Sequence, residues 1–476
     1  MRYQILSVFA ALTASAACGD LTSINDNPNG PTDVQPPSML SNAIQTVVDR
    51  VDGPNNNVDI RGGGLWVQYY AEIQYRDEDK YIVRPGVDGE WGMYSGPLED
   101  FQRMINKGVA AGVPNWEAVG RIMKSYVFSV MTDAMGDIPY SEAFQERALL
   151  TPKYDTQQAI YTALFADLAK ASQQIDPAGI GFSSGDIMYG GDMTTWQKFA
   201  NSLRLRLAMH LTNVAPATAQ SEALAAVTAG VFASNDDNAQ LMYLPSAPNQ
   251  NPIYTNVHVD KRDDYGMSKT LVDSMRSWND PRLPIYAQPN DTGAYEGLPN
   301  GLNDGAGPEL KYISRFGTFW RETPAAPLAL LTYSEVLFLE AEAAERGWIT
   351  GNAAQLYADA IRASMEQYGI ATTAIDAYLA QPRVVYAGGA AGLTQIAYQK
   401  WVSLFMQGME GWTEVRRTGV PALVPGPNAK LTKIPERLPY SDNEAVLNKA
   451  NLDAAVAAQH FSSSTDLTTP LWFTGR

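Results

Sequence analysis

The chain is poor in cysteine and histidine. Cys18 is the only cysteine among 476 residues, and His210, His258 and His460 are the only histidines. If Cys18 is modified, as its position suggests, the rest of the chain has neither disulfide bonds nor a thiolate metal site. We therefore expect a large hydrophobic core to hold the fold, since 45% of the residues are hydrophobic. We expect no cofactor and no metal.

Basic residues are outnumbered, and long apolar runs are missing. Lys and Arg number 35 against 51 Asp and Glu, a formal net charge of -16. This balance argues against nucleic acid and against polybasic adhesion to anionic lipid. A helix that crosses a bilayer needs about 20 apolar residues. Beyond residue 18 the nearest candidate, 325–344, is interrupted by Pro327, Glu335, Glu340 and Glu342.

Motifs that mark catalysis are missing as well. The chain has no HExxH sequence, no GxSxG elbow and no glycine-rich phosphate loop. Acidic clusters such as 77–79 and 236–237 are typical of solvated faces in an acidic protein. We predict a protein that is not an enzyme. A glycoside hydrolase is the alternative, because two carboxylates about 5 to 10 Å apart across a sugar would suffice.

The N-terminus has the pattern of an export signal. Residues 1–17 combine Arg2, an apolar stretch from Ile5 to Leu12 and small residues up to Cys18, which predicts a signal peptide. A cysteine directly after the cleavage point is typical of a bacterial lipobox, although Ser15 stands where such sites usually have leucine. We predict that Cys18 carries a lipid anchor and that 18–37 is a polar tether.

Helical periodicity dominates the rest of the chain. Apolar residues recur at a spacing of 3.6 in several segments, with long loops rich in Gly, Pro and Asn between them. We predict helices at 38–52, 118–135, 157–175, 194–211, 221–233, 269–278, 333–346, 353–368 and 395–418. Within 334–360, small and aromatic residues alternate as in a tetratricopeptide-type hairpin, with Leu337 and Ala341 facing Tyr357 and Ala360.

Several segments together resemble one family. Residues 136–143 (GDIPYSEA), 194–211 (TTWQKFANSLRLRLAMHL), 333–347 (YSEVLFLEAEAAERG), 397–423 (AYQKWVSLFMQGMEGWTEVRRTGVPAL) and 434–444 (IPERLPYSDNE) occur in the order typical of SusD/RagB-type outer-membrane lipoproteins. The chain departs from the pattern at Glu436, where relatives often have arginine, and at Leu471-Trp472-Phe473, where they often have paired tryptophans.

The resemblance implies a fold, a location and a partner. It implies a mostly α-helical single domain over 38–476, built from tetratricopeptide-like helix pairs with long loops and minor β structure. It also implies an outer-membrane lipoprotein, lipid-anchored and facing the cell surface. Its partner would be a SusC-type TonB-dependent transporter, over which the lipoprotein acts as a lid. RagB-like relatives handle peptides and SusD-like ones glycans, so the class of nutrient stays open.

The family motifs themselves read as structural. We expect Gly136 to end a helix and Pro139 to prevent its continuation, with Asp137 capping or orienting the turn. We expect Arg416 and Arg417 to complement the dipole at a helix C-terminus that Gly419 stops. Glu410 is too far from both arginines for a pair within one helix, so its partner must come from elsewhere in the fold.

Binding of a glycan requires flat aromatic faces beside polar side chains. We expect Trp66, Tyr69 and Tyr70, at helical spacing, to pack in the core. Better candidates lie in loops among glycines and polar residues, where the ring faces would be solvated; Arg321 also lies there, beside Trp320. The predicted ligand-binding residues are Tyr75, Trp91, Tyr94, Arg315 and Trp320.

The function predicted from the sequence is capture of a glycan or peptide nutrient for the transporter. The alternative from a different class is a helical-repeat scaffold that docks proteins and binds no small ligand. Free aromatic faces in the loops favour nutrient capture, whereas a smooth charged concave face would favour the scaffold.

Overall fold

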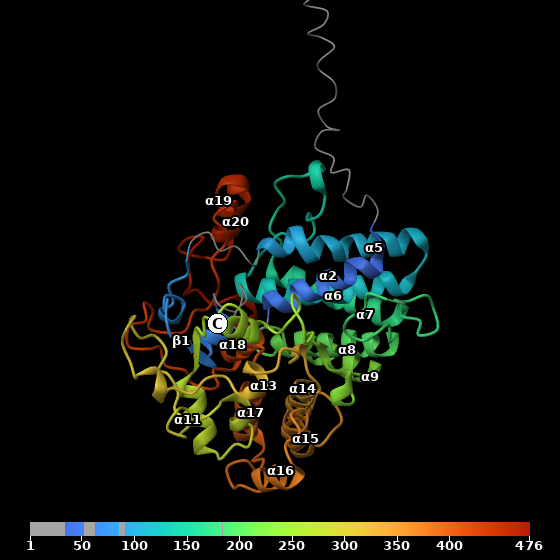
Figure 1. Ribbon diagram of the computed structural model, residues 1–476. Helices are drawn as coiled ribbons and strands as arrows, with labels where there is room; N and C mark the ends of the chain where they lie inside the picture. The colour runs from blue at the N-terminus through green and yellow to red at the C-terminus, as the bar shows by residue number, and fades with distance from the viewer. Residues whose placement is uncertain (1–33, 52–61, 85–90, 183) are drawn as a thin grey trace, which may run out of the picture. The chain divides into compact units, whose positions relative to one another are not determined.

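Helices make up most of the regular structure of the computed structural model, which describes residues 34–51, 62–84, 91–182 and 184–476 (Figure 1). Pro36–Arg476 forms one unit. The predicted signal peptide, Cys18 and most of the tether lie outside the described residues. Among the described residues, no helix is both long enough and apolar enough to cross a membrane.

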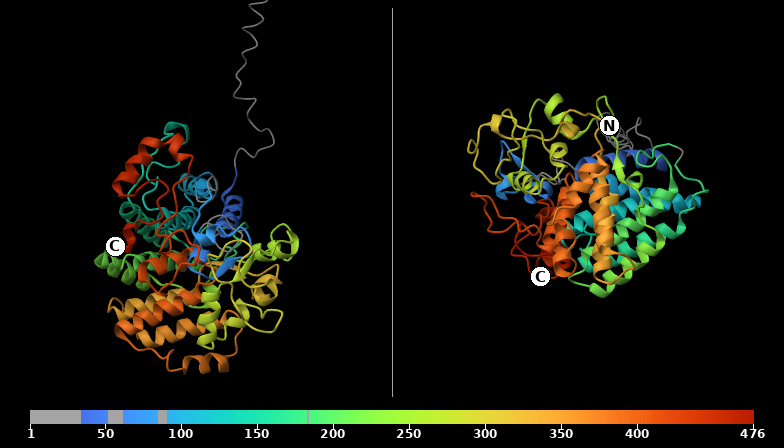
Figure 2. Two further views of the ribbon diagram at one scale, coloured as in Figure 1. Left: turned by 90° about the vertical axis from the view of Figure 1, so that its left-hand side faces the viewer. Right: turned by 90° about the horizontal axis from the view of Figure 1, so that it is seen from below.

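Antiparallel helix pairs follow one another along the chain. α5 (Glu99–Ala111) packs against α6 (Pro114–Met135), which packs against α7 (Gln157–Gln174); α7 packs against α8 (Met193–His210), and α8 against α9 (Pro216–Ala229). Farther along, α14 (Tyr333–Glu345) pairs with α15 (Ala353–Glu366) and contacts α17 (Gly389–Ser403). Seen from below, α14, α15 and α17 lie side by side next to α8 and α9 (Figure 2). The predicted mostly helical, tetratricopeptide-like fold is confirmed.

The α14–α15 hairpin shows why the sequence folds this way. Leu337, Ala341, Tyr357 and Ala360 are all 5% exposed or less and share one core cluster. The small side chains allow the helices to approach closely, and the tyrosine ring fills the groove between them. Gly347 adopts a positive φ of 71° in the turn, where a Cβ would be strained. The spacing predicted from the sequence is confirmed here.

The turn after α6 behaves as its motif predicts. Gly136 has φ 87° and ends the helix, and a Cβ there would lie 2.1 Å from the Oε1 atom of Gln459. The Asp137 carboxylate accepts a hydrogen bond from the backbone N–H of Gln157 at 2.9 Å, at the first turn of α7. Burial raises the pKa of Asp137 to about 6. Gly419 ends α18 (Gly408–Thr418), and it does so in the left-handed conformation. The predicted roles of Gly136, Asp137 and Gly419 are confirmed.

Other helices differ from the prediction. The single helix expected over 395–418 is two, α17 and α18 (Gly408–Thr418), because the chain turns at Met406 with φ 73°. A side chain in this region costs about 1 kcal/mol, which tertiary packing must offset. The helix expected at 221–233 is α9, which begins at Pro216. Other helices occur where none was predicted: α5, α16 (Thr372–Leu379) and α20 (Lys449–Ala458).

Two short antiparallel strand pairs complete the regular structure. β1 (Tyr70–Glu72) pairs with β3 (Tyr265–Met267), and β2 (Ala239–Leu241) pairs with β4 (Leu328–Leu331). Trp66, Tyr69 and Tyr70, just before and within β1, are 0% exposed. Their predicted packing in the core is confirmed.

Candidate ligand-binding cleft

The pairing of β1 with β3 brings together two loops that are distant in sequence. Glu72 lies opposite Tyr265 in the register, and the backbone N–H of Ile73 donates to the carbonyl of Asp264 at 2.8 Å. The loop that follows β1 therefore runs beside the loop that precedes β3. Both are polar and aromatic, and both face one hollow.

The hollow is a cleft of about 580 Å³ that opens to solvent. Its walls come from α2 (Pro36–Val51), from the segment 72–84, from the turn at 248–256 and from 260–265. A volume of this size suits a ligand of a few sugar rings or a short peptide. We call this hollow the β1–β3 cleft.

Tyr75 presents the most exposed aromatic ring of the β1–β3 cleft. Its residue is 61% exposed, whereas the next residue, Arg76, is 4% exposed. Its backbone has φ 57°, a conformation that costs a non-glycine residue about 1 kcal/mol. Strain of this kind is concentrated at functional sites. The second ring, Tyr265, is 6% exposed and packs edge-on against Tyr70 with centroids 5.7 Å apart.

Asp264 organises the polar side of the cleft. Its carboxylate accepts hydrogen bonds from Gln74 at 2.6 Å, Asn256 at 2.9 Å and Arg262 at 2.7 Å. Burial opposes ionisation, but these three donors outweigh it and lower the pKa of Asp264. Asp264 is therefore ionised at neutral pH and holds two amides and a guanidinium in place around the opening.

Two buried carboxyl groups, Glu72 and Glu78, also line the cleft, and the buried Asp79 is hydrogen-bonded to Glu72. Burial and the neighbouring Asp79 raise the pKa of Glu72 well above its ordinary value, and burial raises that of Asp79 to about 7. Arg84 clamps the third carboxylate, Glu78, with two hydrogen bonds of 2.6 and 2.7 Å. A protonated Glu72 can donate a hydrogen bond to a sugar hydroxyl or a peptide carbonyl.

These carboxyl groups are poorly arranged for hydrolysis. Glu72 and Asp79 each accept a hydrogen bond from the backbone N–H of the other, at 3.3 and 3.0 Å. Asp79 also accepts from Asn300 at 2.8 Å, and Glu78 is held by Arg84. A glycosidase needs one free acid and one free base or nucleophile on the two sides of the bond. The geometry suits recognition of hydroxyl and amide groups.

Of the residues predicted to bind ligand, the structure places only Tyr75 among those lining the β1–β3 cleft. Arg315 is 8% exposed and pairs with Asp263 at 3.2 Å. Trp91 is half-buried and donates to Glu444 at 3.1 Å, and its ring lies 5.5 Å from that of Tyr94. The Tyr94 hydroxyl donates to the carbonyl of Pro139 at 2.5 Å. Ligand contacts at these three residues remain predictions.

The expectation that Trp320 has a solvated ring face is wrong. Its side chain is 3% exposed because residues 318–321 form a short helix, α13 (Thr318–Arg321), that turns the ring inward. There it packs against Phe319, with centroids 4.8 Å apart, and against Tyr368 and Phe405. The neighbouring glycines suggested an open loop, and the rings that cover Trp320 come from distant parts of the chain.

Sequence reasoning missed most of the cleft. Six further residues line the cleft: Asp49, Gln250, Asn256, Asp260, Arg262 and Asp264. They lie in segments that were interpreted only as a helix or as a loop between helices. The one available signal was the run Asp260–Tyr265, which places charged residues directly before an aromatic residue. Only the strand pairing shows that this run meets Tyr75.

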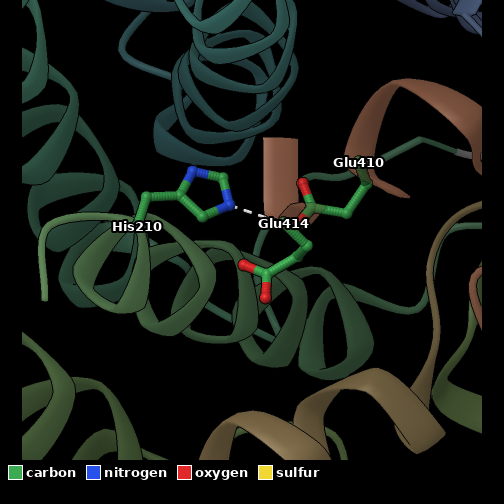
Figure 3. Close-up of side chains that lie close together, drawn as sticks. All are labelled: His210, Glu410 and Glu414. Atoms are coloured by element: carbon green, nitrogen blue, oxygen red, sulfur yellow. Dashed lines mark hydrogen bonds and ion pairs between the residues drawn. The ribbon is translucent and has the colours of Figure 1, made fainter. Parts of the chain in front are cut away.

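A second cluster of charged groups lies inside the helical core, where α8 meets α18. His210 is 1% exposed, and its ring nitrogens lie 3.0 Å from carboxylate oxygens of Asp133 and of Glu410. Figure 3 shows Glu410 and Glu414 beside the imidazole. Glu410 thus finds its partner outside its own helix, as the sequence predicts.

His210, Glu410 and Glu414 have ligand atoms within 4.8 Å of one another, a spacing that could hold a metal ion. Cations already occupy their surroundings: Lys400 lies 3.3 Å from Glu414, and Arg417 lies 2.7 Å from it. Burial opposes protonation of His210, but Glu410 and Asp133 outweigh it and raise its pKa to about 9. A protonated imidazole does not coordinate metal. We interpret the cluster as a structural ion network.

The network makes stability depend on pH. The pKa of His210 in the fold, about 9, exceeds its ordinary value of 6.5, so the stabilisation is complete below about pH 6.5 and is lost as the pH rises through about 9. We expect the free energy of unfolding to fall more between these pH values in the wild type than in His210→Gln. Urea unfolding at both pH values measures the free energy of unfolding of the two proteins. Parallel losses in the two proteins would show that His210 is not the responsible group.

The helix pairs and the solvent-open polar cleft together define a binding protein built on a tetratricopeptide-like scaffold. Residues 28–441 match the family model SusD-like, described as starch-binding associating with outer membrane. The chain belongs to this SusD-like family, whose members are binding proteins, and the resemblance seen in the sequence motifs is confirmed.

Solved structures agree with this assignment. A chitin-binding protein is 30% identical, with a TM-score of 0.82 over 93% of this chain and 100% of that chain. A chitin-binding SusD homologue from Flavobacterium johnsoniae is 26% identical, with a TM-score of 0.80 over 91% and 97% of the two chains. A SusD homologue from Bacteroides fragilis is 26% identical, with a TM-score of 0.80 over 93% and 100%. No curated protein matches the chain significantly.

Proposed function

We propose that the protein captures an oligosaccharide in the β1–β3 cleft at the outer surface of the cell. The observation that carries the proposal is the exposed ring of Tyr75, held in a strained backbone conformation at the mouth of a polar cleft. Its face suits the C–H surface of a sugar. Amides and carboxyl groups around it suit hydroxyl and acetamido groups. Chitin fragments are the first candidates, because two similar structures are named as chitin-binding.

We further propose delivery to a SusC-type TonB-dependent transporter, with the protein anchored in the outer membrane by a lipid on Cys18. The family description, which names association with the outer membrane, supports the location. The position of Cys18 after an export signal supports the anchor.

A ligand screen tests the binding proposal. The protein lacking residues 1–33 is titrated calorimetrically with chitin oligosaccharides, with starch oligosaccharides and with short peptides of mixed sequence. We expect saturable binding of an oligosaccharide class. Binding of peptides alone would replace glycan by peptide as the nutrient. If no member of the panel bound, nutrient capture would give way to the protein-docking scaffold.

Replacement of Cys18 tests the anchor. We expect Cys18→Ala to be folded but to leave the membrane fraction, since lipid is the proposed attachment. Cell fractionation with immunodetection measures the distribution, and Ser15→Leu, which restores the usual lipobox residue, is the matched control that should stay membrane-bound. Retention of Cys18→Ala in membranes of a strain without the transporter partner would contradict lipid anchoring.

A further inference from the structure

Carboxyl groups outnumber guanidinium groups around the β1–β3 cleft. The described residues that line it include five acidic ones: Asp49, Glu72, Glu78, Asp260 and Asp264. The basic ones among them are Arg84 and Arg262, and neither lysine nor histidine is present. If this cleft takes the glycan, its charge therefore has a bearing on which glycans it takes.

Both guanidinium groups are already engaged by carboxylates. Arg84 donates to the two oxygens of Glu78 at 2.6 and 2.7 Å, and Arg262 donates to Asp264 at 2.7 Å. Each pair cancels its own charge. An acidic sugar would have to compete with a carboxylate of the protein for either cation, so the cleft offers an anion little attraction.

Asp49 and Asp260 are left without a cation. Asp260 is exposed and Asp49 is half-buried, and neither forms an ion pair within the described part of the chain. Asp49 accepts a hydrogen bond from the hydroxyl of Tyr243 at 2.5 Å, which is a neutral donor and cancels no charge. Burial raises the pKa of Asp49, and a cation beside this carboxyl would stabilise its ionised form.

Glu72 also forms no ion pair, but its charge is the least available. Burial and the neighbouring Asp79 raise its pKa well above the ordinary value, so Glu72 acts first as a hydrogen-bonding group. The attraction for a cation comes mainly from Asp49 and Asp260.

The shape of the site strengthens this attraction. A cleft lined by one sign of charge concentrates the electric field inside it and raises the local concentration of the opposite charge. The ring of Tyr75, which is 61% exposed, attracts a cation to its face as well as the apolar side of a sugar. A sugar that carries a positive charge would gain from both features.

We propose that the β1–β3 cleft prefers oligosaccharides with free amino groups to neutral and to acidic ones. A protonated 2-amino-2-deoxy sugar places its ammonium beside Asp49 and Asp260 while its ring stacks on Tyr75. The inference rests on the proposed function, and among chitin fragments it selects those that have lost acetyl groups. An acetamido group at the same position is neutral and gains no such attraction.

Three trisaccharides test the preference: the trimers of glucosamine, of N-acetylglucosamine and of galacturonic acid. The mature full-length protein is titrated calorimetrically at about pH 6, where an amine is protonated. We expect the glucosamine trimer to bind about threefold to tenfold more tightly than the acetylated one, and the galacturonic acid trimer to show no saturable binding. Equal or tighter binding of the acetylated or the acidic trimer would overturn this inference and leave glycan capture standing. If no trimer bound, glycan capture in the cleft would fail with it.

Salt separates charge from shape. The preference for the glucosamine trimer should shrink as sodium chloride is raised from about 0.02 M to about 0.5 M, because screening weakens exposed charges. A preference that salt leaves unchanged would show that the acetyl group is rejected by its size, and would contradict the role of the carboxyl groups.

Variants then locate the charge. In Asp49→Asn combined with Asp260→Asn, we expect the ratio of the two affinities, glucosamine trimer to acetylated trimer, to fall at least threefold. Asp236→Asn combined with Glu366→Gln is the matched control: it changes the net charge equally at two exposed positions that do not line the cleft, and should keep the wild-type ratio. If the double variant in the cleft did not fold, Asp260→Asn alone, at an exposed position, should lower the ratio about twofold. An unchanged ratio in the cleft variants, or an equal fall in the control, would overturn the assignment.

Discussion

Arg417→Met should lower the free energy of unfolding by about 3 to 5 kcal/mol, a large part of the roughly 5 to 15 kcal/mol typical of a folded domain. The guanidinium donates two hydrogen bonds to Glu342, at 2.8 and 2.7 Å, and two to Glu414, at 2.9 and 2.7 Å. All three side chains are buried. Burial opposes ionisation of Glu342, but Arg417 outweighs it and lowers its pKa to about 2. Removal of the cation therefore leaves two buried carboxylates with less compensation.

Chemical denaturation at pH 7 measures the loss. Lys449→Met is the matched control, because Lys449 forms an exposed pair with Asp453 at 2.7 Å that contributes about 0.5 kcal/mol or less. Equal, small losses in the two variants would show that the buried network does not hold the helices together. Glu342 adds a pH signature: its contribution is present above about pH 4.5 and disappears as the pH falls towards about 2.

Trp412→Ala should cost a comparable amount, about 3 to 5 kcal/mol. Trp412 is 0% exposed and packs edge-on against Trp66 at 5.0 Å. Its indole donates to the carbonyl of Pro435 at 2.8 Å, and the guanidinium of Arg416 lies 3.5 Å from the ring centroid. Truncation would leave a cavity and unpair a carbonyl.

Thermal and denaturant unfolding measure this loss. Trp348→Ala serves for comparison, because Trp348 is partly exposed and should cost about 1 kcal/mol or less. A loss at Trp412 no larger than that at Trp348 would mean that the contact of α18 with the segment before β1 contributes little to the fold.

The fold was predictable because local patterns and global packing agree in most helices. The 3.6-residue stripe of α2 and the small–aromatic spacing of α14 and α15 each predict a buried face that the structure confirms. The break between α17 and α18 was not predictable, since Met406 is an ordinary helix former whose left-handed backbone is imposed by tertiary packing. α5 was not predicted, although its buried residues Phe101, Met104, Ile105 and Gly108 recur at helical spacing.

The site was less predictable, for a physical reason. A binding cleft is formed by residues that meet in space, and the pairing of three-residue strands leaves almost no periodic signal. Tyr75 was found because a tyrosine among polar residues in a loop is informative alone. The prediction for Trp320 was wrong because the exposure of its ring depends on Phe405 and Tyr368, which lie far along the chain.

The most direct test of the central claim is a calorimetric titration of wild type, Tyr75→Ala and Trp91→Ala with the oligosaccharide found in the screen. Loss of one stacked ring removes about 1 kcal/mol, which is roughly a fivefold change in affinity. We predict that Tyr75→Ala binds about fivefold more weakly at an unchanged melting temperature, because the ring is exposed. Full affinity of Tyr75→Ala, with the loss found in Trp91→Ala, would contradict the account and place the glycan at the cluster around Trp91.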